Sequence, residues 1–190
     1  MITVTDRHFY ENVPFEQYTG LPGFSFSSIK SDFIPIEPTK KMRFGSLVDT
    51  FLSNPAAYDG TMADLVRPIA LEVKRFLGAG WACCKAQMSA TANFTVDGLT
   101  MPHRGRPDFL IPNQLIIDLK VSELPIVKAI EIFRYDWQQG GYCLDFDVKK
   151  AIILSIHPKT KKITTAPIVP VYDWWEHQVK RFGRPNLKAV

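Results

Sequence analysis

Residues 104–120 read RGRPDFLIPNQLIIDLK, two apolar runs separated by Pro112, Asn113 and Gln114. Three-residue hairpin loops need one residue in the left-handed region, usually the last. Asn tolerates that conformation, although the last position here is Gln114. If these three residues form the loop, Asp108 directly faces Asp118 across an antiparallel pair. The segment therefore predicts a hairpin with two carboxylates opposite each other.

Side chains alternate along a strand, so Lys120 shares the face of Asp118. A two-residue loop would instead place the two aspartates on opposite faces, because a shift of one residue exchanges the faces of a strand. Facing like charges are destabilising, and burying them costs several kcal/mol per ion. A hard cation such as Mg²⁺, with Mn²⁺ as a substitute, would relieve this repulsion. We predict Asp108 and Asp118 as metal ligands and Lys120 as the catalytic amine.

A structural alternative exists for each of these residues. Asp108 and Asp118 would then pair separately with surface Arg or Lys residues, and Lys120 would be a solvated residue at the end of a strand. An Asp-x-Lys tripeptide alone occurs by chance in many proteins. The combination of an apolar strand, a Pro-Asp ten residues upstream and the hairpin register favours the functional interpretation.

Composition limits the class of protein. The chain has 190 residues, a hydrophobic fraction of 46% and a net charge of +4, which fit one globular domain that permits a polyanionic partner. Three cysteines are a poor disulfide framework and one fewer than a four-thiolate cluster needs, so we expect buried thiols in a reducing compartment. Neither a signal peptide nor a membrane span is visible. We expect a cytoplasmic protein that binds no membrane.

Periodicity and turn signals predict an α/β fold, with a mixed sheet flanked by helices. Residues 1–25 read as loop and short strand, and Ser27 or Ser28 is expected to cap a helix that runs to Phe33. Asp97-Gly98 is a hairpin turn signal. Asp173 and Glu176 resemble a capping box for the last helix. The remaining expected elements are helices at 41–52, 62–78, 125–146 and 173–183, and strands at 86–95, 99–111, 114–121, 151–156 and 163–169.

Several segments together resemble a known group. GRPD at 105–108 and IDLKVS at 117–122 are similar to the nuclease motifs of the PD-(D/E)XK superfamily. YDWQQGGY at 135–142 resembles the Q-x-x-x-Y helix of its exonuclease VIII (RecE)-like and lambda-type exonuclease branch. FSSIK at 26–30 with MRFGSLVD at 42–49 resembles the N-terminal helical motif of that branch. The similarity spans roughly residues 25 to 145, and the combined order is more specific than any one motif.

The resemblance implies a restriction-endonuclease-like core within a single nuclease domain, residues 1–190. Its parts are a helical part at about 1–80, the catalytic hairpin core at about 85–122, and helices with closing strands at about 124–190. The Leu119 carbonyl and Asp49 would be further metal ligands. Relatives commonly carry histidine at the position of Asp49, and a solvated carboxylate is an equal alternative there. Relatives often carry an acidic residue at the position of Gln87, to which we assign no role.

Residues that would hold DNA come from the resemblance and from charge. Gln138 and Tyr142 are four residues apart, hence on one helix face, and the resemblance places them beside the active site. Arg104 and Arg106 form one of several basic groups. If such groups converge on one rim they would follow a DNA backbone. The other groups are Lys40, Lys41 and Arg43; Lys159, Lys161 and Lys162; and Lys180, Arg181 and Arg184.

By resemblance the expected activity is Mg²⁺-dependent exonucleolytic hydrolysis of double-stranded DNA, serving phage or prophage recombination in a bacterial or phage-infected cell. Its expected partners are DNA, further copies of the chain and a single-strand annealing protein. Two alternatives stay open. One is a structure-specific endonuclease on the same fold, and the other is an inactive DNA-binding or assembly protein.

Overall fold

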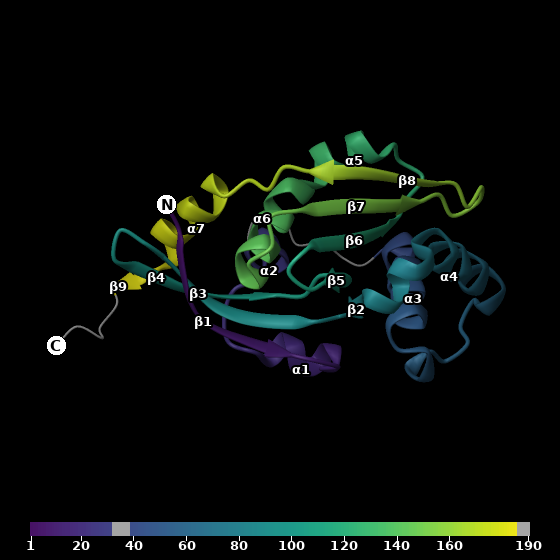
Figure 1. The fold of residues 1–190 in the computed structure, drawn as a ribbon, viewed down its shortest axis with the longest axis horizontal. Helices are drawn as coiled ribbons and strands as arrows, with labels where there is room; N and C mark the ends of the chain where they lie inside the picture. The colour runs from purple at the N-terminus through teal and green to yellow at the C-terminus, as the bar shows by residue number, and fades with distance from the viewer. Residues whose placement is uncertain (32–38, 186–190) are drawn as a thin grey trace.

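Two β-sheets flanked by helices form the structure, a computed structural model that describes residues 1–31 and 39–185 (Figure 1). The first sheet has the order β1-β3-β4-β9 and is antiparallel throughout. The second has the order β2-β5-β6-β7-β8, with β6 and β7 parallel and the other pairs antiparallel. The α/β class with helices flanking mixed sheets is thus confirmed, although two sheets replace the single one expected. No helix in the described ranges is long and apolar enough to cross a membrane.

The strands are β1 (Thr3–Tyr10), β2 (Lys85–Ala86), β3 (Ser89–Val96), β4 (Leu99–Gly105), β5 (Phe109–Ile111), β6 (Leu115–Val121), β7 (Ala151–Ile156), β8 (Ile163–Ile168) and β9 (Arg184–Pro185). The helices are α1 (Phe15–Gly20), α2 (Phe26–Ser31), α3 (Lys40–Ser53), α4 (Ala63–Leu77), α5 (Ile126–Phe133), α6 (Tyr135–Phe146) and α7 (Asp173–Phe182). Two short 3₁₀ helices are η1 (Pro55–Ala57) and η2 (Gly78–Cys83).

The predicted strand at 99–111 is wrong in one respect, because it divides into β4 and β5, which belong to different sheets. Pro107 lies at the division and has no N–H with which to continue a ladder. The predicted strand at 86–95 divides at the same level, where Gln87 is left-handed with φ 51°. The Gln87 N–H donates to the Asp108 carbonyl at 2.9 Å, so the two breaks lie side by side. The two predicted strands therefore cross between the sheets at neighbouring positions: β2 and β5 lie in the second sheet, and β3 and β4 lie in the first.

The β5–β6 hairpin has the predicted register. Phe109 pairs with Ile117, Leu110 with Ile116 and Ile111 with Leu115, which leaves three loop residues. The left-handed residue of the loop is Asn113, with φ 60°, rather than the last position. The hairpin turn predicted at Asp97-Gly98 is also confirmed, since both residues have positive φ between paired Val96 and Leu99.

Helix ends differ from the predictions in three places. Ser25, one turn before Ser28, caps α2 by accepting the Ser28 N–H at 3.1 Å. Its predicted end at Phe33 lies outside the described residues. The helical stretch at 125–146 is two helices, because Arg134 between them is left-handed. The α7 helix begins after Tyr172 without a side-chain cap, so the predicted capping box does not form.

The α6 helix lies between the two sheets and packs on both (Figure 1). Its Tyr142 and Phe146 share a buried cluster with Ile116 and Ile153 of the second sheet and Ala90 of the first. On the other face of the second sheet, α3 and α4 cover Phe109, Ile117 and Leu119. The α7 helix packs on the first sheet through Trp175 and Val179. The β5–β6 hairpin is thus held between α6 on one face and α3 with α4 on the other.

Candidate active site

Asp118 and Lys120 project from β6 toward the α6 side of the second sheet. Residues Ile117 and Leu119 face α3 and α4, whereas Ile116 packs against α6. Because side chains alternate, Asp118 and Lys120 share the face of Ile116. The Lys120 Nζ forms an ion pair with Asp118 Oδ2, and the exposed fractions of the two side chains are 23% and 3%.

Asp108 directly precedes the first residue of β5, at the point where the hydrogen-bonded pairing of β5 with β6 stops. The Leu119 N–H is directed toward β5 beyond the last paired residue, Phe109, and Asp108 Oδ2 accepts it at 2.7 Å. The carboxylate thus replaces a missing backbone acceptor, which fixes it next to Asp118. The Leu119 carbonyl is directed to the same side, because the N–H and C=O of one strand residue point the same way. The structure therefore brings together Asp108, Asp118, Lys120 and the Leu119 backbone.

Asp49 reaches this group from α3 through a residue to which the sequence assigned no role. The Gln87 Nε2 lies 2.7 Å from each oxygen of Asp49. The Gln87 Oε1 in turn accepts from Arg106 Nε at 2.5 Å. Gln87 therefore links a helix carboxylate to a guanidinium at the sheet junction. No sequence pattern marks this link, because it depends on the break between β2 and β3.

The carboxylates of this cluster repel one another. Burial, with repulsion from Asp118, raises the pKa of Asp49 to about 6, although Gln87, Arg106 and Lys120 lower it. Burial and the charges of Asp118 and Asp49 raise the pKa of Asp108 well above its usual range. Burial acts to lower the pKa of Lys120, but the Asp118 and Asp108 carboxylates outweigh it and raise this pKa. The three carboxylates therefore carry more negative charge than the Lys120 ammonium balances.

A divalent cation matches this cluster in ligand chemistry. All the candidate ligand atoms are oxygens, the type that Mg²⁺ prefers. The Asp118 Oδ2 is buried with the Lys120 ammonium as its partner, and the Asp108 carboxyl has a raised pKa that a cation would reverse. Within residues 1–31 and 39–185, however, no three His, Cys, Asp or Glu side chains lie close enough together to hold a metal. The residues fit Mg²⁺ through Asp108, Asp118 and the Leu119 carbonyl, while Asp49 is engaged by Gln87.

Arg104 and Arg106 form a cationic wall together with Tyr18, which the sequence did not single out. Their guanidinium carbons lie 5.8 and 5.4 Å from the centre of the Tyr18 ring. Arg104 Nη1 donates to the Leu21 carbonyl at 2.6 Å. Its Nε and the Arg106 Nη1 are buried and have no hydrogen-bond partner. Both guanidinium groups are therefore enclosed beside Tyr18, where burial lowers the pKa of Arg106.

The α6 helix contributes three side chains. Gln138 Nε2 donates to the Tyr142 hydroxyl at 3.1 Å, which confirms that both lie on one helix face. Burial, with repulsion from Asp118, raises the pKa of Tyr142 well above its usual range. Tyr135, which the sequence did not single out, places its ring centre 4.9 Å from the Lys120 Nζ. An aromatic face at this distance attracts the ammonium and orients it.

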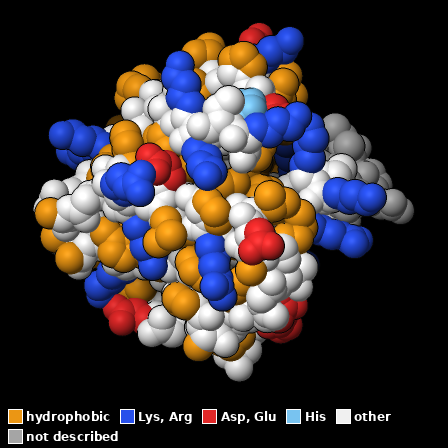
Figure 2. Space-filling model, turned by 90° about the vertical axis from the view of Figure 1, so that its right-hand side faces the viewer, with side chains coloured by type: hydrophobic (Ala, Val, Ile, Leu, Met, Phe, Trp, Pro, Cys, Tyr) orange, Lys and Arg blue, Asp and Glu red, His pale blue; other side chains and the backbone are white. Residues whose placement is uncertain are grey.

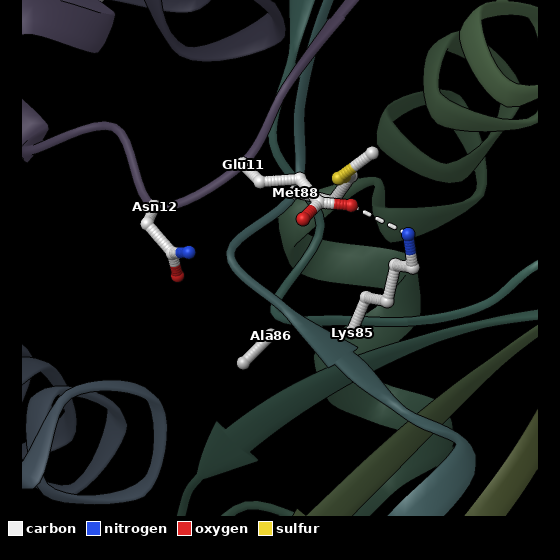
Figure 3. Close-up of a pocket in the computed structure, with 5 residues that line it drawn as sticks. All are labelled: Glu11, Asn12, Lys85, Ala86 and Met88. Carbon is white, nitrogen blue, oxygen red and sulfur yellow. Dashed lines mark hydrogen bonds and ion pairs between the residues drawn. The ribbon is translucent and has the colours of Figure 1, made fainter.

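A small pocket lies next to this region, at the start of β2. It encloses about 140 Å³ between Glu11, Asn12, Lys85, Ala86 and Met88 (Figure 3). Glu11 and Lys85 form an ion pair there, drawn as a dashed line in Figure 3. None of the predicted site residues lines it, so this pocket is separate from the carboxylate cluster.

Comparisons with known proteins leave the chain without a family. It matches no protein-family profile and no curated protein sequence. A solved structure described as "Crystal structure of SSO0001" is similar in fold at 15% sequence identity, with a TM-score of 0.47. The match covers 80% of this chain and 79% of that one.

Proposed function

We propose that this chain is a metal-dependent deoxyribonuclease with a restriction-endonuclease-like core, acting as an exonuclease on double-stranded DNA in phage or prophage recombination. The observation that carries the proposal is the β5–β6 register. It places Asp108 and Asp118 side by side, with the Lys120 ammonium paired to Asp118. The order of motifs along the chain, which resembles the RecE-like branch, supports the substrate and pathway.

Each residue of the cluster has a chemical role in this proposal. Bound through Asp108, Asp118 and the Leu119 carbonyl, Mg²⁺ would supply Lewis acidity and an activated water. The Lys120 ammonium stabilises negative charge that develops on the scissile phosphate. Arg104 and Arg106 supply positive charge beside Tyr18 that attracts phosphate oxygens. Tyr135 holds the lysine in place, and Gln138 orients the Tyr142 hydroxyl by donating a hydrogen bond to it.

Digestion of linear duplex DNA with Mg²⁺ tests the proposal. Wild-type protein should release nucleotides, and Lys120→Ala should lower the rate by a factor of about 100 or more, as loss of one charge-stabilising group does. Lys128→Ala, on the exposed face of α5, is the matched control and should keep full activity. Equal digestion by wild type and Lys120→Ala would refute the assignment.

A closed circular plasmid separates the exonuclease from an endonuclease on the same fold. An exonuclease should degrade the linear form and leave the closed circle intact. Nicking or linearisation of the circle would assign the endonuclease instead. The same Lys120→Ala protein serves as the background control in both assays.

A binding protein without catalysis is the second candidate, and one observation favours it. In the described part of the chain, Lys120 already neutralises Asp118 and three metal-binding side chains do not converge. Calorimetric titration with Mg²⁺ and Mn²⁺, beside Asp118→Asn, discriminates the two. Metal binding by the wild type above the variant supports the nuclease, whereas equal heats in the two proteins support the non-enzyme.

A further inference from the structure

Two basic groups that are far apart in the sequence meet at one carboxylate. Lys41, at the start of α3, pairs with Glu123 Oε2 at 2.8 Å, and Lys159, in the β7–β8 turn, pairs with Glu123 Oε1 at 3.3 Å. Both lysines are about four-fifths exposed, at 80% and 82%. Within the described part of the chain, Glu123 thus holds two cations whose side chains are largely exposed and can meet a polyanion.

Further basic residues flank this ion-pair triad. Lys40 and Arg43 are exposed on the first turn of α3 and line a groove of about 570 Å³, where Asp59 is the only acidic residue among the described lining residues. Lys161 and Lys162 are exposed in the β7–β8 turn. We call the following set the basic rim: Lys40, Lys41, Arg43, Lys159, Lys161 and Lys162. Figure 2 views the end of the molecule that carries α3, α4 and the β7–β8 turn, where Lys and Arg side chains outnumber Asp and Glu.

The turn that carries half of the rim is ordered by its own side chain. His157 Nδ1 accepts the N–H groups of Lys159 and Thr160, both at 3.2 Å. The Lys161 N–H donates to the His157 carbonyl at 2.8 Å. The cations of this turn are therefore presented by a defined backbone, which lowers the entropy lost when they bind.

The rim lies at the same end of the sheet as the catalytic lysine proposed above. Strands β6 and β7 are parallel, so Lys120 near the end of β6 and the turn after β7 occupy one edge. Glu123 follows Lys120 by three residues, at most about 10 Å of extended chain. A duplex with one charge per roughly 1.7 Å of axis would span this distance with several phosphates.

We infer that the basic rim binds the phosphodiester backbone of DNA next to the active site, and that Glu123 is an internal competitor for its two central lysines. This inference rests on the proposed function for the identity of the polyanion. Backbone phosphates replace Glu123 on Lys41 and Lys159, so binding is independent of sequence and weakens with salt. Removal of the Glu123 carboxylate should therefore raise the affinity for DNA, whereas removal of Lys41 and Lys159 should lower it.

Fluorescence anisotropy with a blunt duplex of mixed sequence, in EDTA so that no cleavage occurs, tests the inference. Lys41→Gln/Lys159→Gln should weaken binding at 0.1 M salt by about tenfold or more, and should reduce the slope of log K against log salt by about 2, since each phosphate contact contributes about 0.9. Glu123→Gln should tighten binding about threefold or more. Both lysines are exposed, so the double variant is expected to fold, which circular dichroism checks.

The matched control is Lys180→Gln/Arg184→Gln, which removes the same charge at the opposite end of the molecule, in α7 and β9 (Figure 1). This control should stay within about twofold of wild type, because its charges lie at the end of the molecule opposite the basic rim (Figure 1). Exposed charges separated by more than a Debye length, about 10 Å, are largely screened from each other. An equal loss in both double variants would show a general charge effect and overturn the inference. Unchanged or weaker binding by Glu123→Gln would overturn the role of the carboxylate.

Failure of this inference is distinguishable from failure of the proposed function. Rim-dependent binding without Mg²⁺-dependent digestion would leave the rim standing and remove the nuclease. Digestion that depends on Lys120, combined with equal binding by wild type and the rim variant, would remove the rim alone.

Discussion

Asp49 has a raised pKa in the folded chain, and this makes its effect on stability depend on pH in a defined direction. The carboxyl titrates near pH 6 in the folded state and near 3.8 when unfolded. Between these values the folded state holds more protons, so the contribution of Asp49 to the free energy of unfolding falls as pH rises. Asp49→Asn removes this contribution because the amide does not ionise.

We therefore expect Asp49→Asn to gain stability relative to wild type as the pH rises from 4 to 7. Urea unfolding without divalent metal, at pH 4.5 and pH 7, measures the difference. Asp59→Asn, a change on an exposed loop, is the control: hydrogen bonds from Thr61 lower the pKa of Asp59, so this carboxyl is ionised in both states at pH 4.5 and at pH 7, and its difference from wild type should stay constant. A constant difference between wild type and Asp49→Asn over this range would contradict the assignment of the raised pKa.

Gly105 is required where β4 approaches α6. A Cβ at this position would lie 2.0 Å from Asp145 Oδ2 and 3.0 Å from Tyr142 Cδ1, and both side chains are buried. Gly105→Ala should therefore lower the free energy of unfolding by about 2–3 kcal/mol, in the range of overpacked cores. Gly45→Ala is the matched control, because nothing lies within 4 Å of a Cβ there. It should stabilise α3 by roughly 0.5–1 kcal/mol, and a loss equal to that of Gly105→Ala would contradict the structure.

At the scale of the elements, the loop of the β5–β6 hairpin sets which side chains share a face. Asn113 has φ 60°, whereas Gln114 is not among the residues with positive φ. Asn113→Val should cost about 1–2 kcal/mol, since a β-branched residue is strained in the left-handed region. Gln114→Val, one residue on, should change stability by less than about 0.5 kcal/mol. Thermal unfolding of the two variants compares them, and a larger loss in Gln114→Val would place the left-handed residue at the loop's last position.

The hairpin was predictable because its signals are local. A loop of three residues between two apolar runs determines the pairing, and the pairing determines that Asp108 and Asp118 are neighbours. The same reasoning missed Gln87, because its contacts join residues 49, 87 and 106, which only the folded sheet junction brings together. The position of the left-handed residue stayed open in the sequence, because Asn113 tolerates that conformation whereas the usual position falls on Gln114, and the structure has it at Asn113.

At the scale of the whole molecule, the sequence predicted the class and most elements but not the division into two sheets. The predicted strand at 99–111 joined the two parts, but Pro107 has no N–H with which to continue the hydrogen-bond ladder. The division matters for the site, because Arg104 and Arg106 lie at the junction and face Tyr18 rather than open solvent. What the local pattern lacks is the position of α6, which separates the sheets and contacts both.

A buried hydrogen bond between a histidine and an aspartate connects α6 to the first sheet and permits a test of how firmly the two sheets act as one body. His103 Nδ1 of β4 lies 2.8 Å from Asp145 Oδ1 of α6, and the side chains are 1% and 0% exposed. The His103 ring also stacks on Phe94 and meets Trp175 edge-on, and both centroid distances are 4.5 Å. Removing one partner of such a pair typically costs about 3–5 kcal/mol.

Asp145→Ala should lower the free energy of unfolding by that amount, about 3–5 kcal/mol, whereas Asp173→Ala on the exposed start of α7 should stay within about 1 kcal/mol. Because α6 packs on both sheets, the loss should act on the whole domain and not on the first sheet alone. In a Trp81→Phe background, tryptophan fluorescence reports Trp137, Trp174 and Trp175, which all belong to the cluster on the first sheet, and far-ultraviolet circular dichroism reports all helices and strands. The two urea transitions should therefore coincide in Asp145→Ala. A fluorescence transition that precedes the other would mean that the first sheet unfolds separately, and that α6 does not couple it to the sheet bearing Asp118 and Lys120.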